Sequence, residues 1–372
     1  MESNKRGERL IVFDVRSFLN LFQKGEKDWA IGGAELQMFY LAKELLNSGY
    51  RVVLLGNSSG EDLEDPRFEY CRIPKYYQGS KFHPQKIANL WRSRWPRMLR
   101  NLQKQGLKLV YIQSQLECPR MTRSAKRNGV KIIRRINGDS LVDSNIDESS
   151  ARVKHDRLIR AADCIVVQSE KQRSDLAKNY GLSSTIISSL EPELEYGLEN
   201  WLAQAIWIGR SDPKKNPEAF LDLADQMPER KFVMIMPRSA SPLFSQISSR
   251  ATMLDNLIFL PDLKRSKLLE IVSQSAVAVN TSYTEGMPNT LFEASLFAVP
   301  TVFLYVNPGN QIKEDMGVFI CEGDFNCLKE RVELMLESRI LSKQEGAKAR
   351  RWMKGYFNNS EVVSQYGKLI DN

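Results

Sequence analysis

The sequence predicts an α/β protein built of two doubly wound domains that face each other across a cleft. Its 372 residues are enough for about two domains, and 42% of them are hydrophobic, as in ordinary globular proteins. Apolar, strand-like runs alternate with segments of helical spacing in both halves, which is typical of parallel sheets covered on both faces. The polar stretch 187–204 separates the two series and is the expected linker.

The two halves repeat the same alternation. In the first half, residues 32–50 have helical spacing and end at Gly49, a typical helix stop, and the expected strands are 10–15, 51–56, 109–114, 131–136 and 164–169. In the second half, the expected strands are 205–210, 231–236, 256–260, 276–282 and 301–306, with helices at 217–227, 264–275 and 289–298. We therefore expect domains over 1–195 and 196–351. Ligands of open α/β sheets bind beyond the carboxyl ends of the strands, so the strand-to-helix loops should carry the site.

Composition excludes several classes of protein. The five cysteines are scattered and form no CxxC pair, and there are only two histidines, His83 and His155, so we expect no disulfide framework, no metal centre and no cofactor. No apolar run reaches the length of a membrane-spanning helix, and the N-terminus lacks the pattern of a secretory signal. A cytoplasmic location is therefore expected.

The strongest motif is TSYTEGMPNTLFEASLFAVPTV, at 281–302. A buried strand ends before it, Pro288 fixes the chain, and Asn289 is the expected N-cap of a helix whose first backbone N–H groups form an anion site suited to a diphosphate. Glu285 can accept hydrogen bonds from sugar hydroxyls, and Glu293 can accept two from a ribose diol. The loop and first turn between them add Gly286, Met287, Pro288, Asn289, Thr290 and Leu291 as binding residues.

A second motif, WIGRSDPKKNPEAF at 207–220, places two cations after a strand that ends at Gly209. Arg210 and Lys215 can neutralise a departing nucleoside diphosphate, whose charge develops in the transition state. A third and weaker signal is AIGGAEL at 30–36, where Gly32 and Gly33 let the backbone approach a phosphate or sugar before a helix.

These three motifs, in this order, resemble the family 4 retaining glycosyltransferases of GT-B architecture. The resemblance runs from about residue 10 to 320. It implies two Rossmann-like domains, an acceptor-side domain over 1–195 and a nucleotide-sugar-binding domain over 196–351. The last segment, 352–372, resembles the closing helix that crosses back onto the first domain in that family.

The resemblance also implies a role for each matched residue. Glu285 would contact the donor sugar and Glu293 the ribose, Arg210 and Lys215 would contact the diphosphate, and the GMPNTL loop would supply backbone amides. The family reaction replaces the nucleotide by an acceptor hydroxyl, keeps the anomeric configuration and commonly needs no metal.

The sequence departs from the family pattern in three places. Asn137 stands where many members carry a histidine that contacts the donor sugar; an amide can hydrogen-bond but cannot shuttle protons near neutral pH. Asn137 and Asp139 are the catalytic candidates on this side, and a helix cap is the alternative for Asp139. Ala298 replaces a frequent glycine. Pro237 and Pro261 replace glycines in the loops around the nucleobase, where Pro237 and Leu263 are the expected contacts. We expect UDP rather than GDP as the nucleotide.

The basic character is concentrated in one stretch. Residues 81–138 hold 15 Lys and Arg and one acid, Glu117, a local charge of +14 that exceeds the +8 of the whole chain. Trp91 and Trp95 lie within it, and tryptophan with basic residues is typical of interfacial membrane contacts, although an ordinary packing helix with a solvated charged face explains it equally well. We expect a possible anionic membrane partner and no nucleic acid, since no nucleic-acid motif is present.

The sequence therefore predicts a metal-independent hexosyltransferase. It would move a sugar from a nucleotide-sugar to a saccharide or lipid-linked saccharide, in surface polysaccharide or glycolipid assembly, at the inner face of the membrane or in the cytoplasm. Two alternatives stay open. One is a nucleotide-sugar epimerase of the same fold, and the other is a catalytically silent scaffold subunit that binds sugar nucleotides.

Overall fold

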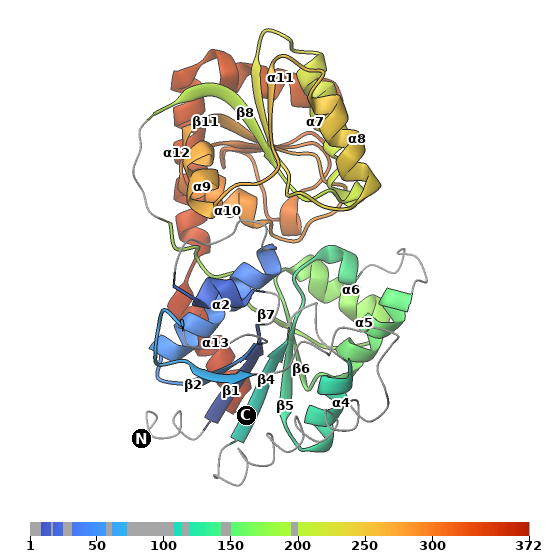
Figure 1. Ribbon diagram of the computed structural model, residues 1–372, viewed down its shortest axis with the longest axis vertical. Coiled ribbons are helices and arrows are strands. Elements are labelled where there is room, and N and C mark those ends of the chain that lie inside the picture. The colour runs from blue at the N-terminus through green and yellow to red at the C-terminus, as the bar shows by residue number, and fades with distance from the viewer. Residues whose placement is uncertain are drawn as a thin grey trace.

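Two separate parallel sheets form the framework of the protein (Figure 1). The computed structural model describes residues 9–15, 18–24, 32–56, 62–72, 108–113, 119–142, 150–194 and 200–371. The first sheet has seven strands and the second six, and every strand pair within them is parallel. The prediction of two doubly wound α/β domains is confirmed.

The first sheet has the strand order β3-β2-β1-β4-β5-β6-β7. Its strands are β1 Arg9–Asp14, β2 Arg51–Gly56, β3 Glu69–Arg72, β4 Lys108–Gln113, β5 Lys131–Arg135, β6 Cys164–Val167 and β7 Thr185–Ile186. Its helices are α2 Gly33–Asn47, α4 Pro119–Arg127, α5 Ser150–Ala161 and α6 Glu170–Tyr180. The five expected strands are present, and β3 and β7 are short strands that the apolar pattern did not indicate.

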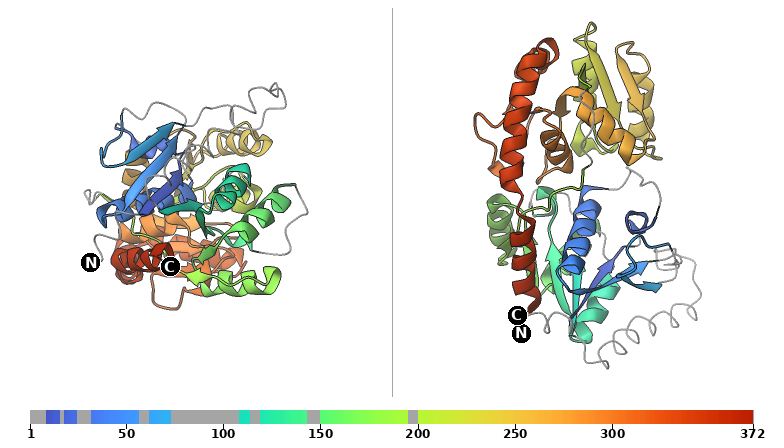
Figure 2. Two further views of the ribbon diagram at one scale, coloured as in Figure 1. Left: turned by 90° about the horizontal axis from the view of Figure 1, so that it is seen from below. Right: turned by 90° about the vertical axis from the view of Figure 1, so that its left-hand side faces the viewer.

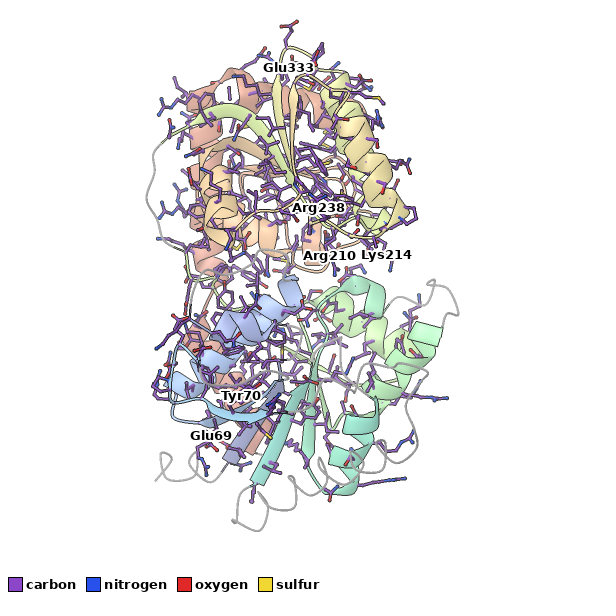
Figure 3. All side chains as sticks on the ribbon, viewed as in Figure 1. Glu69, Tyr70, Arg210, Lys214, Arg238 and Glu333 are labelled. Atoms are coloured by element: carbon purple, nitrogen blue, oxygen red, sulfur yellow. The ribbon has the colours of Figure 1, made fainter. Side chains whose placement is uncertain are left out.

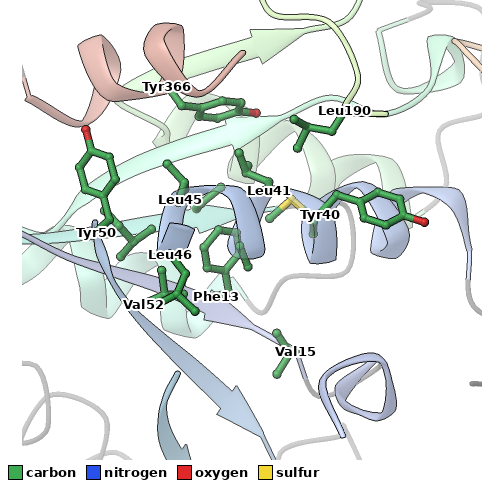
Figure 4. Close-up of a cluster of buried hydrophobic side chains, with 14 of the residues drawn as sticks. Phe13, Val15, Tyr40, Leu41, Leu45, Leu46, Tyr50, Val52, Leu190 and Tyr366 are labelled. Carbon is green, nitrogen blue, oxygen red and sulfur yellow. The ribbon is translucent and has the colours of Figure 1, made fainter. Parts of the chain in front are cut away.

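Both faces of the first sheet are covered, as the alternation along β1 requires. Ile11 and Phe13 point to the core beneath α2, whereas Leu10 and Val12 point to the core on the opposite face. Figure 4 shows Leu41 and Leu45 of α2 beside Phe13 and Val52 of the sheet. Helix α2 ends at Asn47, and Gly49 then takes a positive φ of 88°, which confirms it as the stop signal.

The second sheet has the order β10-β9-β8-β11-β12-β13. Its strands are β8 Leu202–Ile208, β9 Lys231–Ile235, β10 Leu257–Leu260, β11 Ser275–Asn280, β12 Thr301–Phe303 and β13 Val318–Ile320. The helices are α7 Pro217–Asp225, α8 Pro242–Ala251, α9 Arg265–Gln274, α10 Asn289–Leu296, α11 Phe325–Glu337 and α12 Arg339–Tyr356. The sheet order reverses between β8 and β11, and this is the point where ligands of such folds bind.

The chain returns to the first domain at its end. Helix α12 packs on α10, and after a break at Phe357 and Asn358 helix α13 (Asn359–Asp371) lies beside α2 (Figure 2, right). Arg9 donates hydrogen bonds to the carbonyl oxygens of Ile370 and Asp371. The hydroxyl of Tyr366 accepts one from Arg135 at 3.0 Å. The returning segment is thus two helices, and the one on the first domain begins at residue 359.

Two further properties concern only the described residues. Within them, no helix is both long and apolar enough to cross a bilayer. The same part of the chain contains no group of three His, Cys, Asp or Glu side chains placed to hold a metal ion. Residues 81–107 and 114–118 of the basic stretch lie outside the described residues, as do Trp91 and Trp95.

Candidate functional site

A cleft of about 290 Å³ lies between the carboxyl ends of the two sheets. From the first domain it is lined by the loops after β1, β5 and β6, and from the second by the loops after β8, β9 and β11 and the start of α9 and α10. The predicted site residues that line it are Gly32, Gly33, Asn137, Asp139, Gly209, Arg210, Lys215, Pro237, Glu285, Gly286, Met287, Pro288, Asn289, Thr290 and Glu293. Three separate sequence motifs therefore meet in one place.

Two predicted residues do not line the cleft. Leu291 is fully buried in the core that α10 shares with α12, and its N–H donates to the carbonyl of Pro288 at 3.0 Å. Leu263 packs against the apolar core beneath α9. Both side chains pack in the hydrophobic cores behind the cleft.

Glu285 is held by three neighbours at the end of β11. Its Oε1 lies 2.5 Å from Lys215 Nζ and accepts hydrogen bonds from the Ser282 hydroxyl at 2.7 Å and from Asn280 at 3.5 Å. The side chain is 11% exposed. Because one oxygen takes all three contacts, the carboxylate is fixed in position and its other oxygen can face the cleft.

The loop that carries the two cations is fastened to the Glu285 loop. Thr281 Oγ lies 2.9 and 2.7 Å from the carbonyl oxygens of Lys215 and Asn216, and accepts a hydrogen bond from Trp207 at 2.9 Å. Asp212 caps the short helical turn by accepting from the N–H of Lys214. Figure 3 places Arg210 and Lys214 at the edge of the second domain that faces the first. Buried contacts beneath the loops thus aim the cations into the cleft.

Glu293 has a partner that the sequence did not indicate. Arg265 Nη2 at the start of α9 lies 2.7 Å from Glu293 Oε1, with the two side chains 13% and 4% exposed. Burial by itself lowers the pKa of an arginine, but the Glu293 carboxylate and the Tyr40 hydroxyl hold the pKa of Arg265 above its usual value. The only sequence signal was a basic residue after the expected strand 256–260, which is too common to single out.

Asn289 differs from its prediction as an N-cap. The N-cap of α10 is Pro288, and Asn289 is the first helical residue. Its side chain instead crosses to the first domain, where Nδ2 donates to the carbonyl of Gly33 at 2.9 Å and Oδ1 accepts from Gln37 at 3.3 Å. A side chain at Gly33 would collide with Asn289, since an added Cβ would lie 2.9 Å from Nδ2. The glycine thus permits a close approach between the domains.

The first-domain wall holds buried polar groups. Asp139, 6% exposed, accepts a hydrogen bond from Gln172 at 2.9 Å and pairs with Lys171 at 3.2 Å, and burial raises the pKa of its carboxyl group. Asn137 Oδ1 accepts from Arg135 at 3.1 Å. Among the described residues, Asn137 Nδ2 and Gln168 Oε1 are buried without a hydrogen-bond partner. This wall therefore offers the cleft amide groups and the carboxyl groups of Glu35 and Asp139, and no cation is among its described lining residues.

Solved structures share this arrangement over almost the whole chain. A sucrose-phosphate synthase from Thermosynechococcus elongatus superposes with a TM-score of 0.73 at 16% identity, covering 97% of this chain and 98% of the other. TarM gives a TM-score of 0.73 at 12% identity, with coverages of 98% and 99%. At such identities the likeness concerns the fold. The architecture is that of the GT-B glycosyltransferases.

Sequence comparison defines the family. Residues 31–189 match Glycosyltransferase Family 4, and residues 199–352 match Glycosyl transferases group 1. A D-inositol 3-phosphate glycosyltransferase of Catenulispora acidiphila is 23% identical over 184 residues, a match that spans 42% of this chain and 43% of that relative's length. The chain belongs to the family 4 glycosyltransferases, as the three motifs predicted.

Proposed function

We propose that the protein transfers a sugar, with retention of configuration, from a nucleotide-sugar to a hydroxyl of a saccharide or lipid-linked saccharide. The observation that carries this proposal is the pairing of Lys215 with Glu285 beside the start of α10. The pairing supports the proposal, because a cation suited to a leaving diphosphate and a carboxylate suited to sugar hydroxyls lie within one hydrogen bond of each other.

Each element of the cleft has a task in this reaction. Arg210 and Lys215 stabilise the charge that develops on the leaving diphosphate as the bond to the anomeric carbon breaks. Glu285 orients the sugar and Glu293 binds the ribose. The first turn of α10, with the partial positive charge of its backbone N–H groups, adds to the anion site. The new bond joins the anomeric carbon to the acceptor oxygen, which approaches from the first-domain wall, and the hydroxyl proton passes to an oxygen of the departing diphosphate.

We propose UDP as the nucleotide and surface polysaccharide or glycolipid assembly as the context. Solved relatives support UDP: TarM of S. aureus was solved with UDP, and the pneumococcal O-GlcNAc transferase GtfA with UDP and GlcNAc. A trehalose-phosphate synthase of Burkholderia xenovorans is described as UDP-forming. The nucleobase lies in this proposal against the loop that carries Pro237.

A thermal-shift panel of UDP, GDP, ADP and their sugars tests the donor. A ligand that binds only the native state stabilises it by about 2.7 kcal/mol at a hundredfold excess over its Kd, so the donor raises the melting temperature most. Lys215→Ala is the matched variant, because it removes a proposed diphosphate contact and should lose the shift. If no sugar nucleotide stabilises the wild type, the proposal is wrong.

Acceptor dependence separates the alternatives. A transferase consumes the donor faster when an acceptor is added, and the new glycoside appears in the product. An epimerase would convert the donor to its isomer without any acceptor. A catalytically silent scaffold would bind the donor and would convert neither the donor nor the acceptor into a product.

We also propose that the basic stretch 81–138 brings the enzyme to an anionic membrane surface that carries the acceptor. Arg134 and Arg135 of this stretch are buried, and its other basic residues support the proposal, because basic segments bind anionic lipid by an attraction that salt screens. Co-sedimentation with vesicles tests it. Binding should be strong to anionic vesicles, weak to neutral ones and reduced by salt, and equal binding to both would contradict it.

A further inference from the structure

One face of helix α2 meets the second domain. Gly33, Gln37 and Tyr40 lie four and three residues apart, so they share that face. The carbonyl of Gly33 accepts a hydrogen bond from Asn289, and Gln37 donates one to Asn289. The hydroxyl of Tyr40 interacts electrostatically with Arg265 and Glu293. On the other side, Asn289 and Glu293 lie one turn apart on α10. Two helices from different domains thus meet along a row of polar side chains.

The first-domain end of this row is fixed. The amide of the buried Gln37 donates to the carbonyl of Leu190 at 3.1 Å and accepts from its N–H at 2.8 Å. Figure 4 shows Leu190 packed over α2, and the ring of Tyr40 leaving the apolar cluster with its hydroxyl directed away from Leu45. Burial raises the pKa of Tyr40 to about 12, so the hydroxyl is neutral at pH 7 and can accept from a cation.

Glu293, the carboxylate that we propose binds the ribose, lies at the second-domain end of the row. A buried carboxylate without a partner loses its charge or its position. Arg265 supplies the partner to Glu293 through one nitrogen and one oxygen at 2.7 Å. A carboxylate accepts about four hydrogen bonds, so this single contact leaves acceptor positions for the two hydroxyls of a ribose.

We propose that Arg265, held from the first domain by Tyr40, positions Glu293 for the ribose of the donor. The inference rests on the proposed function and adds two positioning residues to it. The affinity for the nucleotide then depends on the contact between α2 and α10, because the row of side chains that orients the Glu293 carboxylate is complete only when the two domains are in contact.

The ribose hydroxyls provide the test. Kd values for UDP and for 2′,3′-dideoxy-UDP, which lacks the hydroxyl pair, are measured by calorimetry on the wild type and on Arg265→Met. The substitution should raise the Kd for UDP by about tenfold or more, as expected for loss of a charge-assisted contact. It should leave the Kd for the dideoxy analogue within about twofold of its wild-type value, because that ligand makes no contact that Glu293 governs.

Tyr40 is tested through a double-mutant cycle. Tyr40→Phe removes one oxygen and should raise the Kd for UDP by about threefold in the wild-type background. It should have no effect in the Arg265→Met background, since its action passes through Arg265. A residue that only supported the fold would weaken binding equally in both.

Two control variants test whether a loss of affinity reflects a general loss of structure. Arg230→Met removes another paired arginine of the second domain, whose partner Glu333 lies at the far end from Arg210 in Figure 3, and both Kd values should stay unchanged. Arg265→Lys keeps the charge if the methionine variant fails to fold, and should show a smaller, still UDP-selective loss.

Three outcomes would overturn the inference. Equal loss of UDP and dideoxy-UDP affinity would show that Arg265 attracts the phosphates directly. Unchanged UDP affinity in both Arg265 variants would show that it does not position Glu293. Failure of the wild type to bind UDP, GDP or ADP would refute the proposed function itself, and the inference with it.

Discussion

The two walls of the cleft are built differently. The second-domain wall contains opposite charges in contact, Lys215 with Glu285 and Arg265 with Glu293. The first-domain wall contains backbone groups, amides such as Asn137 and the acids Glu35 and Asp139, and its described lining residues include no cation. A diphosphate requires fixed cations, whereas neutral hydroxyls can be bound by any well-placed amide. We therefore expect substitutions in the second-domain wall to affect the reaction more.

The largest loss is expected for Lys215→Ala. It removes a proposed diphosphate contact and leaves Glu285 without its charged partner, so kcat/KM should fall by about 10²–10³-fold, the range for a lost transition-state donor. Steady-state transfer assays measure this. Lys267→Ala is the matched control, because Lys267 forms a surface pair with Glu270 on α9 away from the cleft. Comparable loss in both variants would contradict the assignment.

Glu285→Gln should have the next largest effect. The amide keeps the size of the side chain but loses the charge that pairs with Lys215, so kcat/KM should fall by roughly 10²-fold. Circular dichroism should show an unchanged fold. Retention of most activity would mean that the carboxylate does not bind the sugar.

Gly286→Ala tests how closely the two walls approach. An added Cβ would lie 3.0 Å from Gln168 Oε1 and Gln172 Nε2, both on the first-domain wall. These buried amides, or the walls that carry them, must then move by a few tenths of an ångström, and we expect kcat/KM to fall by about tenfold, as for other small displacements at a reacting centre. Gly355→Ala is the control, since a Cβ there meets nothing within 4 Å. Equal activities would show that the reaction tolerates a wider gap.

Asp139→Asn should have the smallest effect on turnover, less than about tenfold, because the side chain is already bound by Gln172 and Lys171. A loss above about a hundredfold would instead identify Asp139 as the general base.

The stability of Asp139→Asn relative to the wild type should depend on pH. Burial raises the pKa of Asp139, so the native state holds this proton more tightly than the unfolded state. The ionised group therefore destabilises the fold at neutral pH, and this penalty disappears as the pH falls through the native pKa toward the ordinary value. In urea unfolding, the free energy of unfolding of Asp139→Asn relative to that of the wild type should be greatest near pH 7 and should decrease toward pH 4. A difference that does not change with pH would contradict the burial effect.

Much of the fold could be predicted because buried parallel strands are continuous apolar runs. Ten such runs became strands. The other three were not predicted, because β3 and β7 lack a continuous apolar run of strand length and β13 is an isolated run of three residues. The site was predictable where one motif carried the charges, as with Glu285 and Glu293. Arg265 and Tyr40 were not, because each comes from a different element and neither stands in a distinctive local sequence.

The sequence by itself determined the α/β class, the two domains, the family and the charged residues Arg210, Lys215, Glu285 and Glu293 of the second-domain wall, since all of these depend on local patterns. Only the tertiary structure decided that Asn289 reaches across to Gly33 instead of capping its helix, and that Glu293 is paired with Arg265. These contacts join residues 256 and 28 positions apart. Contacts of this kind are set by how helices and sheets pack, and no local pattern of residues specifies them.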